Sequence, residues 1–206
     1  MSELSDRSGV SVASIKFYQR EELLPEPERT SPNQSRYEDG HVERLRLVRA
    51  LIDVGGLSVA AVRQVLAAAE ADIPLDWAMG VAQHAIPGSV ELPDESSAGL
   101  REINGVVAEL GWNVSTDNPG RAMAARVIDS YLQLDHEELL SVLPEYSRAA
   151  AIVASVDLAS VALQPDRARM AETVVVGTVL GDSLLAGLRR MAQEDASHRM
   201  VSGAQS

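Results

Sequence analysis

The residues of this chain that could carry acid–base or metal chemistry are scattered along the sequence. Its four histidines are His41, His84, His136 and His198, and none of them has a neighbouring cysteine or a second histidine at metal-ligand spacing. Cysteine is absent from the 206 residues, which excludes disulfides, thiolate metal sites and cysteine nucleophiles. We therefore predict a protein that is not an enzyme, with no catalytic residue, no metal and no cofactor.

One short run resembles acid–base machinery more closely than the rest. His136 is followed by Glu137 and Glu138, and general acid–base catalysis uses such groups. The run from Asp135 to Glu138 also has the form of a capping box, and carboxylates stabilise the positive N-terminal end of a helix. We interpret it as the start of a helix. The sequence contains no phosphate-binding glycine loop, nucleophile elbow or paired-carboxylate motif.

Recognition of DNA is the chemistry that the start of the sequence indicates. The spacing predicts a helix over residues 2–8 that ends at Gly9, and a second helix over 12–20 that Ser11 caps. Two short helices joined by a tight turn form a helix-turn-helix, whose second helix enters the major groove. The candidate DNA-binding residues on or near that helix are Ser11, Ala13, Ser14, Lys16, Phe17 and Tyr18.

The second helix must present one side to DNA and bury the other. The spacing of Tyr18 from Ser14 predicts that Tyr18 faces the same side as Ser11 and Ser14, with its hydroxyl able to donate to phosphate, while Ile15 points inward. Phe17 fits either contact with DNA or packing in the core.

A wing follows the second helix. Residues 25–37 hold three prolines and no helical periodicity, which predicts a short two-stranded turn before a helix over about 38–54. Arg36 and Tyr37 close this wing. These residues complete the predicted DNA-binding set.

Two further helices complete the N-terminal part. Gly55 and Gly56 end the first of them, and Ser58 caps a helix over 59–71. A solvated face is the ordinary interpretation of charges along one side of a helix, and we expect one on the helix over 38–54. Its members are Arg44, Arg46 and Arg49.

Six short motifs recur in order over residues 3–68, and with their spacing they resemble the MerR family of bacterial transcription regulators. They are Gly9-Val10-Ser11, Ile15-Lys16-Phe17-Tyr18, Leu23-Leu24-Pro25, Arg36-Tyr37, Val42-Glu43-Arg44-Leu45 and Gly56-Leu57-Ser58. Glu22 departs from the pattern because the family usually has glycine there, and Gln34-Ser35 replaces its usual Gly-Tyr. The resemblance implies that Arg36 meets the DNA backbone. It also implies a homodimer bound to promoter DNA beside RNA polymerase, which switches by twisting an overlong spacer.

Charge is divided unevenly between the two parts of the chain. Residues 1–70 carry 9 basic and 11 acidic side chains, whereas residues 71–206 carry 9 and 19. A local basic surface is therefore possible in the first part despite the net charge of −12. The first ten residues lack the order of a signal peptide, and the apolar stretch over 173–188 is too short to cross a membrane. We expect a cytoplasmic, nucleoid-associated bacterial protein with no membrane partner.

Beyond residue 71 the sequence departs from the family design. Pro74, Pro87 and Pro93 interrupt the long dimer helix that the resemblance places there. We predict a DNA-binding domain over 1–71, a short helix and linker over 72–97, and an all-helical effector and dimerisation domain over 98–206. Its helices are expected at about 95–111, 119–134, 135–163 with a kink at Pro144, and 165–195. The fold class is therefore mostly α, and the second part is similar to TetR-type effector domains by architecture alone.

Large side chains are rare in the acidic part, where aromatic residues are few. Trp77, Trp112, Tyr131 and Tyr146 are candidates to line an apolar pocket for a small organic effector, or to fill core space between alanine-rich helices. The absence of cysteine excludes the inducers that thiolates bind, which favours an organic effector.

The last helix is apolar on most of its circumference, so it requires a partner helix. Val175, Val179 and Leu180 supply bulk, and Gly177 and Gly181 permit close approach. That partner is either intramolecular or a dimer mate, and we assign it to the mate. Two other functions remain open for the chain: a DNA-organising winged-helix protein without effector, and a protein that sequesters a ligand.

Overall fold

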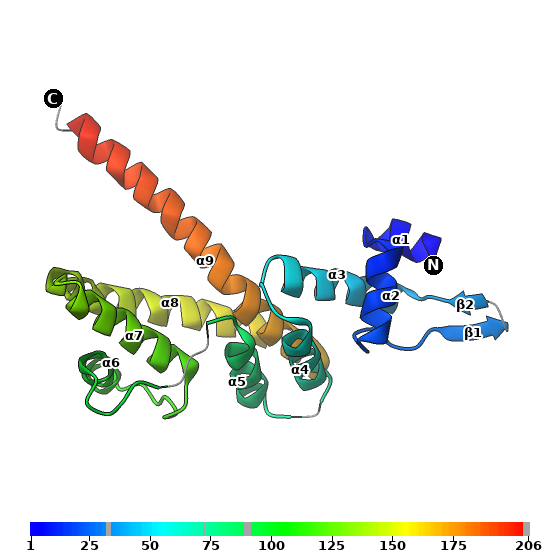
Figure 1. Cartoon of the computed structure of the whole chain (residues 1–206), viewed down its shortest axis with the longest axis horizontal. Coiled ribbons are helices and arrows are strands. Elements are labelled where there is room, and N and C mark those ends of the chain that lie inside the picture. Colours follow the sequence, from blue (N-terminus) through cyan, green and yellow to red (C-terminus); the bar gives the residue numbers. More distant parts are fainter. Residues whose placement is uncertain (32–33, 72, 89–91, 204–206) are drawn as a thin grey trace. The chain divides into compact units, whose positions relative to one another are not determined.

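The computed structural model describes residues 1–31, 34–71, 73–88 and 92–203 and shows the mostly helical fold that the sequence predicts (Figure 1). By packing, the chain divides into unit 1, Met1–Ala67 with Val175–Ser206, and unit 2, Ala68–Val174. The elements in chain order are α1 (Ser2–Ser8), α2 (Val12–Arg20), β1 (Glu28–Ser31), β2 (Gln34–Arg36), α3 (Asp39–Asp53), α4 (Val59–Glu70), α5 (Leu75–Ala85), α6 (Ala98–Glu109), α7 (Pro119–Gln133), the 3-10 helix η1 (Glu137–Val142), α8 (Leu143–Ala162) and α9 (Arg167–Gly203).

The helix-turn-helix of unit 1 forms where the capping signals place it. Gly9 ends α1 in the left-handed region at φ 71°, and its N–H donates to the Ser5 carbonyl at 2.8 Å. The Ser11 hydroxyl accepts from the Ser14 N–H and starts α2. Figure 1 shows α1, α2 and the β1–β2 hairpin gathered at the N-terminal end of α3. Ile15 and Leu45 are fully buried in this packing.

The predicted wing is an antiparallel hairpin. Glu28 on β1 lies opposite Arg36 on β2, and Arg29 lies opposite Ser35. The register is irregular between Arg29 and Ser31, close to the tip of the hairpin. Two strands alone are marginal in water, so the wing depends on its attachment to α2 and α3.

Glu22 occupies a conformation that glycine adopts more easily. Its φ is 58°, in the left-handed region, directly after α2 ends. That region costs a residue with a Cβ roughly 1–2 kcal/mol, and glycine avoids this cost. We expect Glu22→Gly to raise the free energy of unfolding by about 1 kcal/mol in a urea titration. A decrease would show that the Glu22 side chain stabilises the turn.

The middle of α9 packs within unit 1. Val175 and Val179 are 1% and 2% exposed. A Cβ at Gly55 would lie 2.4 Å from Val179 Cγ1, so the glycine at the α3–α4 turn is what allows α9 to approach. Ser183 donates to the Val54 carbonyl at 3.4 Å. The assignment of these valines to a dimer mate is therefore wrong, because the same chain buries them.

This packing also changes how the chain is divided. The sequence placed residues 98–206 in one domain, whereas the structure groups Val175–Ser206 with the helix-turn-helix. The cause is a contact between residues more than a hundred positions apart, which no local pattern reveals. Within the described residues, no other element lies within 4 Å of a Cβ placed at Gly177 or Gly181, so the close approach expected at these glycines is not made within the chain.

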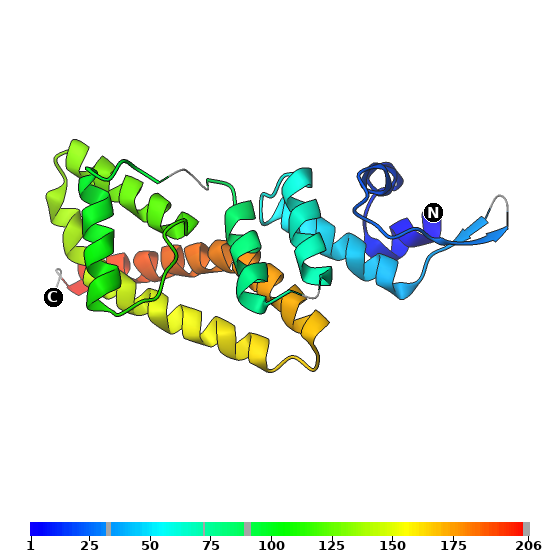
Figure 2. The same cartoon turned by 90° about the horizontal axis from the view of Figure 1, so that it is seen from below.

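Unit 2 is assembled around small side chains. A Cβ at Gly99 would lie 2.0 Å from the Ala125 carbonyl oxygen, so α6 and α7 cross in close contact there. Ala78, Val161 and Val174 form a second small cluster that joins α5, α8 and the first turns of α9. Figure 2 shows α8 as a straight rod from η1 to the turn before α9. Alanine-rich cores bury little area, and many larger apolar side chains of unit 2 stay exposed.

The helix predicted over 135–163 has a different construction. Residues Glu137–Val142 form the 3-10 helix η1, and α8 begins only at Leu143. Pro144 lies in the first turn of α8, where its missing N–H breaks no hydrogen bond, so it does not kink the helix. His136 Nδ1 and Glu138 Oε1 are 2.8 Å apart at the exposed start of η1. The predicted capping box at Asp135 is therefore wrong: His136 precedes the first 3-10 turn without a side-chain capping bond, and Asp135 lies in the left-handed region at φ 58°.

Asp129 ties α7 to the start of α6. Its carboxylate accepts from the Ser97 hydroxyl at 2.7 Å and from the Gly99 N–H at 2.8 Å. These bonds, with Ser97 the larger, lower the pKa of Asp129 below the ordinary value. Since the folded state holds the ionised form, its contribution to stability is present at neutral pH and is lost as pH falls below about 4.

We expect Asp129→Asn to be less stable than wild type at neutral pH, with the difference shrinking towards about pH 3. Thermal unfolding followed by circular dichroism across this range measures the difference. A difference independent of pH would show that the charge of Asp129 contributes nothing.

Two helical segments are longer than the apolar stretch over 173–188 that the sequence indicated. Glu137–Ala162 and Arg167–Ser202 are each long and apolar enough to cross a membrane. The second exceeds the stretch over 173–188 because α9 continues to Gly203. Length and composition alone do not separate a membrane helix from one that packs on another protein. The most apolar windows of these segments are 0% and 22% buried.

Candidate nucleic-acid interface

The outer face of α2 carries half of the predicted DNA-binding residues. Ser11, Ala13 and Lys16 are exposed, and Ser14 is half-buried. The Ser11 and Ser14 hydroxyls lie 2.9 Å apart at the helix start. Lys16 thus offers a solvated ammonium next to small side chains that leave room for a DNA backbone or base edge.

Tyr18 does not lie on that face. It is 8% exposed and packs inward beside Ile15, and burial raises the pKa of its hydroxyl. The expectation that Tyr18 faces the same side as Ser11 and Ser14 is wrong, because the core of unit 1 takes the side chain. Phe17 is half-buried beside Tyr18, with ring centroids 5.8 Å apart, and it lies closer to the outer face.

Arg20 belongs to the outer face and was missed. It is exposed one turn after Lys16, and its guanidinium lies 5.9 Å from the centre of the Phe17 ring. The i,i+4 spacing from Lys16 was the signal that identifies it. The outer face of α2 is therefore Ala13, Lys16, Phe17 and Arg20, with Ser11 at its start.

The wing is attached to the helix-turn-helix through Tyr37. Its hydroxyl accepts from Gln19 Nε2 at 3.2 Å, and its ring meets His41 edge-on with centroids 5.4 Å apart. His41 is buried and accepts the Glu38 N–H at 3.1 Å through Nδ1, which caps α3. Tyr37 is half-buried and joins wing, α2 and α3, whereas Arg36 is exposed beside it. Tyr37 positions the wing, and Arg36 is an exposed charge at its end.

The arginines of α3 clamp the helix-turn-helix. Arg44 Nε donates to the Leu23 carbonyl at 2.9 Å, Arg46 to the Arg7 carbonyl at 2.8 Å and Arg49 to the Gly9 carbonyl at 2.8 Å. The Leu23 carbonyl follows the end of α2, and the Arg7 carbonyl lies in the last turn of α1. The Gly9 carbonyl lies in the turn between the two helices. Such charge-assisted bonds satisfy carbonyls that the helix ends leave open. The expectation of a merely solvated face is therefore wrong.

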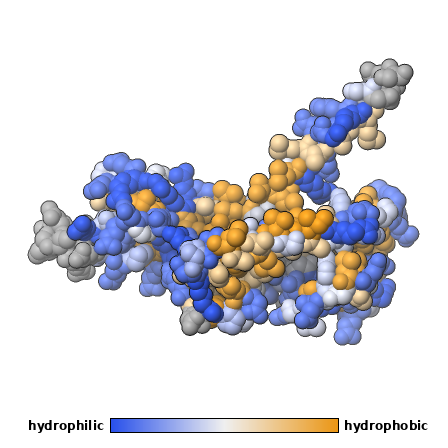
Figure 3. Space-filling model, turned by 180° about the vertical axis from the view of Figure 1, so that it is seen from behind, coloured by the Kyte–Doolittle hydropathy of each residue, from blue (hydrophilic) through white to orange (hydrophobic). Residues whose placement is uncertain are grey.

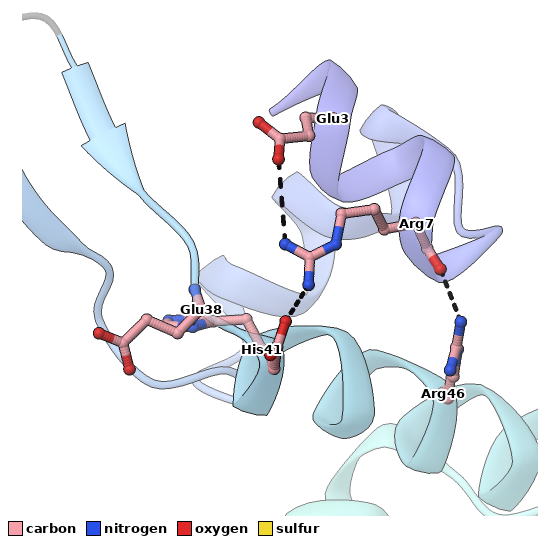
Figure 4. A network of polar contacts seen from close by, with 6 residues as sticks. Glu3, Arg7, Glu38, His41 and Arg46 are labelled. Carbon is pink, nitrogen blue, oxygen red and sulfur yellow. Dashed lines mark hydrogen bonds and ion pairs between the residues drawn. The ribbon is translucent and has the colours of Figure 1, made fainter.

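A second set of contacts joins the end of α1 to α3 and the end of α2 to α4. Arg7 forms an ion pair with Asp39 at the start of α3 and lies 3.9 Å from Glu3 (Figure 4). On α4, Arg63 donates to the Glu21 carbonyl at 2.7 Å and to its carboxylate at 3.1 Å. Basic residues thus fix the orientation of α2 within unit 1, while Lys16, Arg20 and Arg36 stay exposed around it.

The candidate ligand residues of unit 2 are spread over different elements. Trp77 on α5 is 64% exposed and Tyr146 on α8 is 49% exposed. Trp112 follows α6 and Tyr131 lies on α7, and both are half-buried. They belong to four different segments, and two of them face solvent. In the described ranges, no three or more histidine, aspartate or glutamate side chains gather as a metal site would require.

Comparisons with known proteins agree with this geometry. Residues 1–69 match the model of the MerR HTH family regulatory protein. A crystal structure of SCO5550 from Streptomyces coelicolor A3(2), described as a candidate transcriptional regulator, is 34% identical with a TM-score of 0.67, covering 96% of this chain and 95% of that one. The N-terminal part of the chain is a MerR-family domain. Its resemblance at the motifs of residues 3–68 is confirmed, and residues 1–69 form the family's helix-turn-helix domain.

Two curated MerR relatives match only this domain. The mercuric resistance operon regulatory protein of Bacillus cereus is 38% identical over 53 residues, and that of Serratia marcescens is 42% identical over 48 residues. The matches span 26% and 23% of this chain, and 40% and 33% of those proteins. The MerR domain is therefore shared with them, whereas the resemblance to SCO5550 continues through the helices that follow.

Proposed function

We propose that this MerR-family protein regulates transcription by binding promoter DNA as a homodimer. The observation that carries the proposal is the outer face of α2, where Lys16 and Arg20 stay exposed while the arginines of α3 are used to hold the helix in place. A rigidly held helix with exposed cations suits the major groove, and Arg36 of the wing suits the adjacent backbone. Two copies double the contacts of one small winged helix on a symmetric site.

The proposed switch is a change in promoter geometry. The regulator would sit between the −35 and −10 elements, beside RNA polymerase, and twist an overlong spacer into register. Effector binding would favour one dimer geometry over another. In vitro transcription tests this on two templates that differ only in spacer length. We expect activation on the lengthened spacer and none when the spacer has consensus length, whereas equal activity on both templates would contradict the mechanism.

We further propose a small organic effector bound in unit 2. The two curated relatives are named for mercuric resistance, but this chain has no cysteine to supply thiolate ligands. Trp77, Trp112, Tyr131 and Tyr146 are the aromatic side chains of unit 2, and the proposed effector binds against some of them. Quenching of tryptophan fluorescence by compounds of this class is the direct assay.

A protein that organises DNA or sequesters a ligand would behave differently. A DNA organiser would occupy many sites outside promoters in a genome-wide map. A sequestering protein would bind its ligand without any change in affinity for the operator. The proposed regulator is expected in the bacterial cytoplasm at promoters, and no enzymatic role is proposed.

A further inference from the structure

His41 is a buried histidine whose two ring nitrogens have different surroundings. It is 7% exposed at the start of α3, and its Nδ1 accepts the Glu38 N–H at 3.1 Å. A ring nitrogen that accepts a hydrogen bond carries no proton, so Nε2 holds the proton of the neutral imidazole. Among the described residues, Nε2 has no hydrogen-bond partner. The site therefore fits the neutral ring and presents a donor where the protonated ring would need an acceptor.

The neutral ring of His41 supports the wing in two ways. The bond from the Glu38 N–H completes a capping box, in which the Glu38 side chain accepts the His41 backbone N–H in return. The ring also meets Tyr37 edge-on, with 5.4 Å between the centroids. Tyr37 accepts from Gln19 on α2, and Arg36 directly precedes it at the end of β2. A displaced His41 would therefore loosen the attachment of Arg36 to unit 1.

Each element that packs at the start of α3 contributes charged or titratable groups. Figure 3 shows mostly hydrophilic side chains at this end of unit 1. The groups are the amino group of Met1, Glu3 and Arg7 on α1, Lys16 and Arg20 on α2, Arg36 and Tyr37 at the end of the wing, and Glu38, Asp39 and Arg44 on α3. Between about pH 7 and pH 5.5, histidine is the side chain that ordinarily changes its charge. His41 is the one histidine of residues 1–69.

We propose that neutral His41 positions the wing for DNA, and that protonation of this imidazole releases the wing and weakens DNA binding. The proposal rests on the proposed function for its DNA readout. A proton on Nδ1 meets the Glu38 N–H, so the capping bond is lost and two donors face each other. The charged ring also finds no acceptor for Nε2 in the buried site, so it turns out to water. A two-stranded wing is marginally stable by itself, and its release therefore needs little energy.

Weaker binding in acid is the opposite of what added charge alone predicts. His84, His136 and His198 are exposed, and their protonation adds positive charge, which favours binding to DNA. Release of the wing acts in the other direction. An ordinary imidazole, with a pKa of about 6.5, is roughly nine-tenths protonated at pH 5.5. We therefore expect the affinity for DNA to fall about fivefold between pH 7 and pH 5.5 at constant ionic strength.

Substitution of His41 by asparagine separates positioning from titration. The asparagine Oδ1 occupies the place of Nδ1 and can accept the Glu38 N–H, but the amide takes up no proton in this range. Fluorescence anisotropy of the full chain on a labelled duplex of random sequence measures the affinity. Between pH 7 and pH 5.5, His41→Asn should change it by less than about twofold. His136→Asn, which replaces an exposed histidine of unit 2, should keep the wild-type pH profile.

Proton NMR of the wild-type chain observes His41 without DNA. Its Cε1–H resonance is assigned through the nuclear Overhauser contact with the Tyr37 ring, which lies 5.4 Å away between centroids. This resonance should titrate between pH 7 and pH 5.5, and the Tyr37 ring resonances should shift with it. A His41 resonance that did not titrate in this range would overturn the proposal, whether or not His41→Asn folds.

The DNA measurements separate this proposal from the proposed function. An equal loss of affinity in acid for wild type and His41→Asn would also overturn the role of His41. If the affinity did not depend on pH but still fell with Lys16→Ala, the switch would be refuted and DNA binding would stand. A wild-type protein that bound no duplex at pH 7 would refute the proposed function itself.

Discussion

Replacing Lys16 and Arg36 together by alanine is expected to weaken binding of operator DNA by about a hundredfold, since each lost contact costs roughly 1–3 kcal/mol at a base edge and less at a phosphate. Lys16 lies exposed on α2, and Arg36 lies exposed at the end of β2. Each removed charge should also flatten the slope of log affinity against log salt by about one unit. Fluorescence anisotropy at several salt concentrations measures both effects.

The matched control is Arg101→Ala, which removes an exposed arginine of unit 2. It should leave the affinity and the salt slope unchanged. Arg20→Ala should act in the same direction as Lys16→Ala, because both belong to the outer face of α2. If Lys16→Ala and Arg36→Ala changed neither affinity nor slope, the assignment of this face to DNA would be wrong.

The second large effect concerns stability. Val179→Asp should lower the free energy of unfolding by about 3 kcal/mol or more, because it places an unpaired carboxylate in a buried apolar site. Val179 is 2% exposed and lies against Gly55 at the α3–α4 turn. Urea unfolding followed by circular dichroism measures the change.

Gln193→Asp is the control for this substitution, since Gln193 is exposed on the same helix. It should change the free energy of unfolding by less than about 0.5 kcal/mol. A Val179→Asp protein of wild-type stability that was merely monomeric would return Val179 to the dimer contact that the sequence first suggested.

The helix-turn-helix was predictable because its signals are local. Gly9 and Ser11 end one helix and begin the next through their own backbone geometry and capping bonds, so the boundaries of α1 and α2 follow from the sequence. The wing was predictable because residues 25–37 hold three prolines and no helical periodicity. The side of α2 on which Tyr18 lies did not follow, since Tyr18 is about 40° from Ser14 and about 60° from Ile15 around the helix. Only the packing of the surrounding helices decides between those neighbours.

Other features depended on distant contacts. The carbonyl partners of Arg46 and Arg49 lie 39 and 40 residues away, so their clamping role is invisible in a run of charges. The burial of Val179 on α9 depends on Gly55, because Gly55 lies in the α3–α4 turn and a Cβ there would collide with Val179. The start of α8 depended on Pro144 fitting the first turn of a helix rather than bending one. Periodicity identifies an apolar face, but it does not say which surface covers that face.

Sequence-specific DNA binding is tested most directly by selecting binding sites for the full chain from a pool of random duplex DNA. Wild-type protein should enrich an inverted repeat whose half-sites suit two winged helices on one face of the duplex, and the Lys16→Ala, Arg36→Ala double variant should enrich none. Retention of DNA by wild type without enrichment of any sequence would contradict a promoter-specific regulator and favour a DNA-organising protein.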